Sequence, residues 1–295
     1  MPAASLHALL AHSIDYAGMF PPCGLPLEAA LQNHAQYVRS SDAWMLNSFV
    51  LPVDQFEAAA AHLASFDKKH PLRVSALGSK GADLKRTGEM IREFARAHAD
   101  SLSIVQLEMR LPDHVDLAFL QDASATFGEA RLHIFWEAPP DSAEEMIGLL
   151  AQLKEPRFGY KLRTGGVTAD AFPTSVQIAE SLLAASKHHV PIKFTAGLHH
   201  PLRQFRDEVG AKMHGFLNVL GAAVLASEHH WDEGEIVQML EDERAASFSF
   251  EETVFGWREW EMTAERLNAR RKYVTSFGSC SFDEPREDLR ALNLL

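Results

Sequence analysis

Residues 158–203, FGYKLRTGGVTADAFPTSVQIAESLLAASKHHVPIKFTAGLHHPLR, contain two short apolar runs separated by one helical pattern. We expect strands at Gly159–Leu162 and Pro191–Phe194, with a helix at Thr174–Lys187 between them. Two strands joined by a helix of this length normally lie parallel in one sheet, with a right-handed crossover. The stretch therefore predicts one βαβ unit of an α/β fold.

The same alternation extends over most of the chain and predicts a (β/α)₈ TIM barrel, with an open doubly wound sheet as the alternative. The chain has 295 residues, which suits one such barrel of about 250 residues with an extension. The remaining expected strands are His12–Tyr16, Trp44–Leu51, Leu72–Leu77, Ile104–Met109, Leu132–Trp136 and Met213–Val219. The remaining expected helices are Leu27–Val38, Val53–Phe66, Lys85–His98, Val115–Phe127, Ser142–Leu153, Pro201–Glu208 and Leu220–Ser227.

The pattern changes near Trp231, so we expect residues 1–230 to form the barrel and residues 231–295 to form a C-terminal extension packed on it. This tail is too short for an independent enzyme domain. Its GSCSFDEP segment, from Gly278 to Pro285, begins with glycine, ends with proline and has small polar residues between them. This composition is typical of an ordered loop, which would either seal a core or cover a site.

Composition excludes several classes of function. The formal net charge of −12 argues against a nucleic-acid partner, because phosphate backbones are bound by clustered Lys and Arg. The sequence shows neither a signal peptide nor a membrane span, and we expect a cytoplasmic protein. No glycine-rich nucleotide motif follows the first expected strand, and the two cysteines form no metal-binding motif, so we expect no cofactor and no metal.

Two lysines stand out, because a charge inside a strand of a parallel sheet is costly unless it is paired or lies at the rim. Lys161 and Lys193 fall on neighbouring expected strands at similar height. Repulsion between two close ammonium groups should lower one pKa, and a neutral lysine can attack a carbonyl to form a Schiff base. The alternative is that both lysines neutralise carboxylates of the barrel or bind a substrate anion.

This part of the chain resembles the deoxyribose-phosphate aldolases, which carry K-x-x-T-G, A-T-P-x-S and K-x-x-G-G motifs in this order. The matching residues are Lys161, Thr164, Gly165, Pro173, Ser175, Lys193 and Gly197, and Asp15 in SIDY matches the aspartate of the family's first strand. The resemblance implies a class I aldolase in which Lys161 forms the Schiff base and Lys193 lowers its pKa. It also implies that Glu108, at the end of VQLEMR, moves protons and that Asp15 orders the lysine or a water.

The chain departs from this family where the family binds phosphate. After the second lysine strand, Leu198 replaces the second glycine, and His199 and His200 occupy the loop. After the expected eighth strand, the sequence Asn218–Gly221 lacks the family's serines. These differences favour a substrate without phosphate or one that carries a carboxylate.

Further residues at the expected strand ends are candidates for substrate contact. Arg163 follows Lys161 by two positions and therefore points to the same side of the strand, where it can bind a carboxylate or pair with Glu108 or Glu137. The substrate-binding candidates are Arg163, Thr164, His199, His200, Asn47, Glu137 and Cys280.

We therefore predict a lyase of the class I aldolase type that acts on a small polar carbonyl compound, such as a sugar or a hydroxy-keto acid. The expected partner is this small molecule, and a homo-oligomer is compatible with the sequence. The first alternative is a metal-dependent barrel isomerase or hydrolase whose candidate ligands are Asp15, Glu108, Glu137, His12, His199 and His200. The second is a non-catalytic barrel that binds an anion through Lys161, Arg163 and Lys193.

Overall fold

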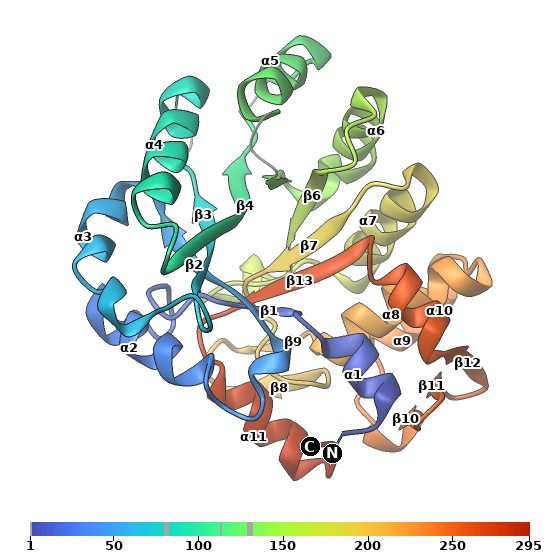
Figure 1. The fold of residues 1–295 in the computed structure, drawn as a ribbon. Helices are drawn as coiled ribbons and strands as arrows, with labels where there is room; N and C mark the ends of the chain where they lie inside the picture. Colours follow the sequence, from blue (N-terminus) through green and yellow to red (C-terminus); the bar gives the residue numbers. More distant parts are fainter. Residues whose placement is uncertain (1, 80–82, 113, 129–131) are drawn as a thin grey trace.

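The computed structural model describes residues 2–79, 83–112, 114–128 and 132–295. Eight parallel strands close into a barrel in the order β1-β13-β7-β6-β5-β4-β3-β2 (Figure 1), so the fold is a (β/α)₈ TIM barrel. The strands are β1 (Ile14–Tyr16), β2 (Leu46–Pro52), β3 (Leu72–Leu77), β4 (Leu102–Arg110), β5 (His133–Glu137), β6 (Phe158–Arg163), β7 (Ile192–Thr195) and β13 (Val274–Ser279). The predicted fold class is confirmed.

Helices connect successive strands outside the barrel (Figure 1). They are α2 (Leu27–Tyr37), α3 (Phe56–Ala60), α4 (Leu84–Ala97), α5 (Leu117–Phe127), α6 (Ala143–Leu153) and α7 (Ser175–His188). Helix α7 begins with a capping box in which Thr174 and Gln177 satisfy each other's backbone N–H groups. A further helix, α1 (Ala4–Leu10), precedes β1. Among the described residues, no helix is long and apolar enough to cross a membrane.

The eighth barrel strand is not the one predicted. Residues Met213–Val219 were expected to form it, but β13 at Val274–Ser279 pairs with both β7 and β1 and closes the barrel. The prediction that the barrel ends at residue 230 is therefore wrong, because the tail supplies a barrel strand. Much of the expected strand belongs to helix α8 (Phe216–His229), in which every residue from Phe216 to Ala226 is buried.

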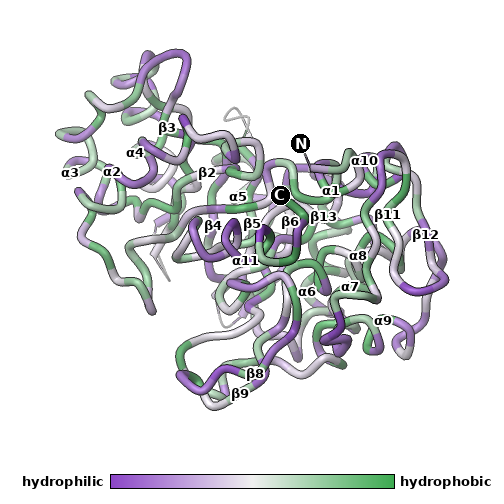
Figure 2. Tube along the Cα trace, turned by 90° about the horizontal axis from the view of Figure 1, so that it is seen from below, coloured by the Kyte–Doolittle hydropathy of each residue, from purple (hydrophilic) through white to green (hydrophobic). Residues whose placement is uncertain are grey.

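A physical reason explains the error. Helix α8 packs against α7, β13, α9 (Glu233–Leu240), α10 (Ala264–Arg270) and β12 (Trp260–Thr263), so its apolar residues surround the whole helix. Figure 2 shows it mostly in the hydrophobic colour. A continuous apolar run cannot be assigned to helix or strand by periodicity alone. Conversely, the barrel-facing position Ser276 of β13 is polar, whereas the neighbouring Phe277 faces α8. Because the inward side chain is not apolar, the segment did not resemble a buried strand in the sequence.

The long connection from β7 to β13 contains the other additions to the barrel. A hairpin of β8 (Gln204–Arg206) and β9 (Ala211–Met213) replaces the predicted helix Pro201–Glu208, and its turn contains Gly210 at φ +64°. Strands β10 (Phe248–Phe250), β11 (Val254–Trp257) and β12 form a small antiparallel sheet beside α8 and α10. Helix α11 (Asp283–Ala291) follows β13.

The barrel strands separate apolar from polar side chains. Positions that face the helices are apolar, as with Phe277 of β13, whose ring stacks on Phe216 of α8 at 5.2 Å. Positions that face the barrel interior include buried polar and charged groups: Asp15, Ser48, Ser75, Gln106, Glu108, Lys161, Lys193 and Ser276. The hydrophobic core therefore lies between strands and helices, and the interior is free to hold a polar network.

Between α2 and the barrel lies a histidine with a defined effect on stability. His34 is 1% exposed, its ring contacts Tyr16 and Phe49, and neither ring nitrogen has a hydrogen-bond partner in the described structure. Burial lowers the pKa of His34 to about 3. Because the unfolded chain binds a proton at about pH 6.5 and the folded chain does not, stability should fall as the pH decreases through this range.

We expect the His34→Phe variant to lose less stability on acidification than the native chain. Between pH 7 and pH 5, the difference should reach about 2 kcal/mol, because one proton is bound only on unfolding. Urea unfolding of both proteins at the two pH values measures this. Equal pH dependence would show that the folded protein accommodates the protonated ring.

Candidate active site

The carboxyl ends of the barrel strands surround a cavity of about 480 Å³. This is the end of the barrel at which enzymes of this fold place their chemistry. Charged residues line its floor and one side, whereas the β1–α2 loop supplies Phe20, Pro21 and Pro22. The charged lining residues of strands β4, β5 and β6 are Glu108, Arg110, Glu137, Lys161 and Arg163.

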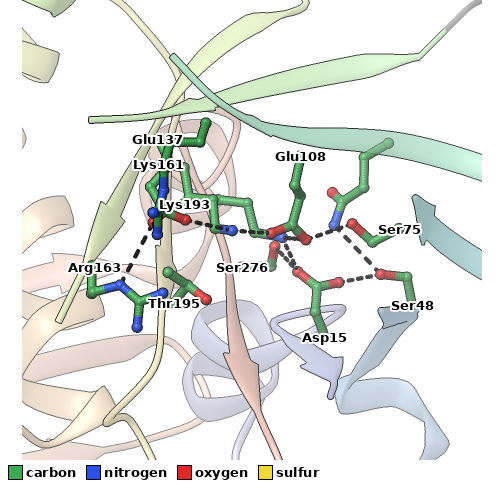
Figure 3. A network of polar contacts seen from close by, with 12 residues as sticks. Asp15, Ser48, Ser75, Glu108, Glu137, Lys161, Arg163, Lys193, Thr195 and Ser276 are labelled. Carbon is green, nitrogen blue, oxygen red and sulfur yellow. Dashed lines mark hydrogen bonds and ion pairs between the residues drawn. The ribbon is translucent and has the colours of Figure 1, made fainter. Parts of the chain in front are cut away.

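Lys161 lies between two carboxylates. Its Nζ is 2.8 Å from Oε2 of Glu108 and 2.8 Å from Oε2 of Glu137, and its side chain is 6% exposed (Figure 3). The pairing of β5 with β6 places Glu137 directly beside Lys161. An amine held between two carboxylates has proton acceptors at both sides, and it faces the cavity where a small molecule could bind.

Lys193 lies behind Lys161, and the two ammonium groups are separated by a carboxylate. The side chain of Lys193 is 1% exposed, and its Nζ donates to Oε1 of Glu108 at 2.5 Å and to Oδ2 of Asp15 at 2.8 Å. Although burial alone would lower the pKa of Lys193, its ion pairs with Asp15 and Glu108 raise it. Glu108 pairs with both lysines and so offsets the direct repulsion that the sequence predicted between them.

Both glutamates of this cluster are held ionised. Burial raises the pKa of Glu108, but the ammonium groups of Lys161 and Lys193 outweigh it and hold the pKa well below its usual range. Burial likewise raises the pKa of Glu137, and Lys161, Arg163 and Arg110 together lower it. Glu108 also accepts from Ser75 Oγ at 2.5 Å, whereas Glu137 lies nearer the cavity opening.

Asp15 positions Lys193 rather than Lys161. Its carboxylate is fully buried and accepts hydrogen bonds from Ser276 Oγ at 2.5 Å and from Ser48 Oγ (Figure 3). It also accepts one from Asn47 Nδ2 at 2.7 Å. Asn47 was predicted to contact the substrate. It instead lines a separate opening at the amino ends of the strands, because it is the second residue of β2.

Arg110 and Arg163 lie on the same side of the cavity as Glu137. Arg110 Nη2 is 3.1 Å and Arg163 Nε is 3.6 Å from the same atom, Oε1 of Glu137, and both arginine side chains remain about half exposed. The pairing predicted for Arg163 with Glu137 is confirmed. Sequence reasoning missed Arg110, although it follows Glu108 by two positions, which is the spacing that identified Arg163.

Two more predicted substrate contacts lie outside the cavity. Thr164 is buried, and its hydroxyl hydrogen-bonds to the carbonyl oxygens of Thr195 and Ala196, so it joins the ends of β6 and β7. His200 is buried and its Nδ1 lies 2.6 Å from Oδ2 of Asp288 on α11. Both side chains therefore position the chain, because their polar atoms already have partners within it.

His199 and Cys280 do line the cavity. His199 Nδ1 is 3.2 Å from Oε2 of Glu284, and Cys280 Sγ is 2.9 Å from Sγ of Cys23 in the β1–α2 loop. Because β13 is the eighth strand, the strand ends at Ser279, and Cys280 and Ser281 follow it. The expectation that no serine follows the eighth strand is therefore wrong.

The six candidate metal ligands do not converge. Lys193 lies between Asp15 and Glu108, Lys161 lies between Glu108 and Glu137, and His12 lines the opening at the other end of the barrel. Within residues 2–79, 83–112, 114–128 and 132–295, no group of three His, Cys, Asp or Glu side chains is arranged to hold a metal ion. The carboxylates converge on lysines instead.

No protein-family model and no curated protein matches this chain. Among solved structures, the catalytic domain of a hyperthermophilic chitinase from Pyrococcus furiosus is similar with a TM-score of 0.41 and 10% identity, over 82% of this chain and 92% of that chain. Two structures of a proposed deoxyribose-phosphate aldolase from Toxoplasma gondii ME49 are also similar. They have 8% identity and TM-scores of 0.38 and 0.36, over 98% of this chain and 96% and 93% of those chains.

At these identities and TM-scores, the similarities carry no argument about function. The barrel assignment rests on the strand order and the parallel pairing of this chain itself. The resemblance to aldolases seen in the sequence stays a prediction.

Proposed function

We propose that this protein is a lyase of the class I aldolase type, which forms a Schiff base between Lys161 and a small polar carbonyl compound. One observation carries the proposal: Lys161 faces a cavity at the carboxyl end of a TIM barrel, with its Nζ held 2.8 Å from each of two glutamates. In the described part of the chain, Lys161 is the one lysine that lines this cavity.

Glu137 is better suited than Glu108 to move protons during the reaction. Glu108 is bound by two ammonium groups and the Ser75 hydroxyl, which hold its negative charge firmly. Glu137 is also paired with cations, but it lies nearer the rim of the cavity than Glu108 does, so its carboxylate is within reach of a bound molecule. Lys193 and Asp15 then keep Glu108 in place rather than taking part in the chemistry.

The proposed reaction begins when Lys161 transfers a proton to Glu137 and its Nζ attacks the carbonyl carbon. The carbonyl oxygen takes up a proton, and loss of water leaves a protonated imine. Glu137, having released its proton, accepts one from the hydroxyl on the carbon β to the imine. The carbon–carbon bond breaks, an aldehyde leaves, and the electron pair forms an enamine, which is protonated and hydrolysed to free Lys161.

The substrate would be oriented by cations at the rim. Arg110 and Arg163 both retain exposed N–H groups beside the cavity, and guanidinium groups bind carboxylates in a fixed geometry. A hydroxy-keto acid would place its carboxylate there while its carbonyl meets Lys161. The small residues Gly166 and Gly197 leave space in the same wall.

Borohydride trapping tests the proposal. The protein is incubated with a panel of small aldehydes, ketones and keto acids, reduced, digested and mapped by mass spectrometry. A stable adduct on Lys161 supports Schiff-base chemistry and identifies the substrate class. If no carbonyl compound forms an adduct, or if adducts form only on exposed lysines such as Lys68, the proposal fails.

The non-catalytic alternative predicts a different result. An anion-binding barrel would bind carboxylates through Arg110, Arg163 and Lys161 without forming a covalent adduct. Binding of a keto acid that survives replacement of its carbonyl by a hydroxyl group, with no trapping of the keto acid itself, would favour that alternative.

A further inference from the structure

A second cavity lies at the opposite end of the barrel, at the amino ends of the strands. Its volume is about 380 Å³. Arg73, from the second position of β3, lines one side of it, and Arg271 and Lys272, which precede β13, line another. Strands β1 and β2 separate β3 from β13 in the barrel, so the basic groups approach the opening from different sides.

The charge of this opening is opposite to that of the whole protein. The chain has a net charge of −12, yet the described residues that line this cavity include three basic side chains and no Asp or Glu. Several neutral hydrogen-bonding groups lie beside them, including Asn47, Gln106 and Asn268. Basic groups collected in a concave surface concentrate anions even on an acidic protein.

The basic groups also lack counter-charges. Among the described residues, none of Arg73, Arg271 and Lys272 forms an ion pair, whereas most basic residues elsewhere in the chain do. Arg73 Nε donates to the Asn47 carbonyl at 2.9 Å, and the outer N–H groups of its guanidinium have no hydrogen-bond partner among the described residues.

Arg271 is the deepest of the three. Its Nη atoms contact the carbonyl oxygens of Ala11, Val274 and Thr275, and its Nε is buried with no hydrogen-bond partner in the described structure. Burial lowers the pKa of Arg271 to about 10, and no carboxylate among the described residues offsets this effect. A buried guanidinium normally has a carboxylate partner, so this one fits a site whose negative charge comes from a ligand.

We propose that this opening is a second binding site, for the phosphate group of a small molecule or for inorganic phosphate. A phosphate carries up to two negative charges and several acceptor oxygens, which suits one lysine and two arginines better than a single carboxylate does. The proposal does not depend on the proposed aldolase activity, because the two cavities lie at opposite ends of the barrel and only binding is measured.

The inner wall of this site is shared with the polar network of the barrel. Asn47 and Ser276 line the opening, and both donate to Asp15, which in turn pairs with Lys193. A phosphate bound here would therefore lie on the same chain of hydrogen bonds that positions the active-site glutamate.

Isothermal titration of the full chain with inorganic phosphate, at constant ionic strength, tests the site. We expect saturable binding that weakens at least about tenfold in the Arg73→Ala/Lys272→Ala variant, since two charge-assisted contacts are lost. The Lys69→Ala/Lys85→Ala variant removes two exposed lysines that form no ion pair with any described residue, and it should bind as the native chain does. The Arg163→Ala variant, altered at the other cavity, should also bind normally.

Crystals soaked in tungstate then locate the anion by its anomalous scattering. Density beside Arg73 and Lys272 is the expected result. Absence of saturable binding for both inorganic phosphate and a phosphate monoester, equal weakening in the Lys69→Ala/Lys85→Ala control, loss of binding in Arg163→Ala, or density only in the active-site cavity would each overturn the proposal. Binding of a phosphate monoester but not of free phosphate would assign the site to a phosphorylated metabolite.

Discussion

Replacing Lys193 with methionine should lower the free energy of unfolding by about 3–5 kcal/mol, because it leaves buried carboxylates without their counter-charge. Lys193 is completely buried and is the ion-pair partner of Asp15 and one of two partners of Glu108. For a chain of this size, a loss of this kind corresponds to a decrease in Tm of roughly 10 °C. Thermal and urea unfolding measure it.

Two variants control this experiment. Lys68 also forms an ion pair, with Asp100 at 2.9 Å, but its side chain is 79% exposed, so Lys68→Met should leave the stability close to that of the native chain. The Lys193→Met/Asp15→Asn variant removes both members of one pair and should regain part of the lost stability. If Lys193→Met were as stable as Lys68→Met, the buried cluster would not depend on this lysine.

The sequence predicted most of the barrel because seven of its strands follow local rules. Runs such as Leu46–Pro52 and His133–Glu137 are short, mostly apolar and followed by helical patterns. The sequence analysis failed at the eighth strand because it assigned residues of α8 to that strand instead of residues of β13. Which of the two segments closes the barrel depends on packing between residues that are far apart in the sequence. Helix α8 is apolar all round only because the β10–β12 sheet and α9 cover the side that faces away from the barrel.

The candidate site could be predicted as a set of residues but not as a set of contacts. Lysine and glutamate at strand ends indicated Lys161, Lys193, Glu108 and Glu137, because charges are rare in such strands. The sequence could not show that Glu108 lies between the two lysines, since this depends on strand register and side-chain reach. Thr164 and His200 were also predicted to contact the substrate. In the structure, the Thr164 hydroxyl donates to the carbonyl oxygen of Ala196, and the His200 ring contacts the carboxylate of Asp288.

Lys161→Arg should abolish carbon–carbon cleavage while leaving the protein folded. The arginine keeps a positive charge between Glu108 and Glu137 but cannot form an imine. With the substrate that trapping identifies, we expect kcat to fall by at least about 1,000-fold, which equals about 4 kcal/mol of transition-state stabilisation. Lys193 cannot replace the lost amine, because its side chain is 1% exposed and Glu108 lies in front of it.

A second variant separates the nucleophile from the proton carrier. In Glu137→Gln, the amine of Lys161 keeps Glu108 as a proton acceptor. Borohydride should therefore still fix a carbonyl compound on Lys161, although more slowly than in the native chain, whereas turnover should decrease by about 100-fold or more because the proton carrier of the cleavage step is lost. In Lys161→Arg, both trapping and turnover should disappear while the circular dichroism spectrum stays native. Turnover by Lys161→Arg within tenfold of the native rate would refute the role of Lys161 and favour a reaction in which the cluster only binds and polarises its substrate.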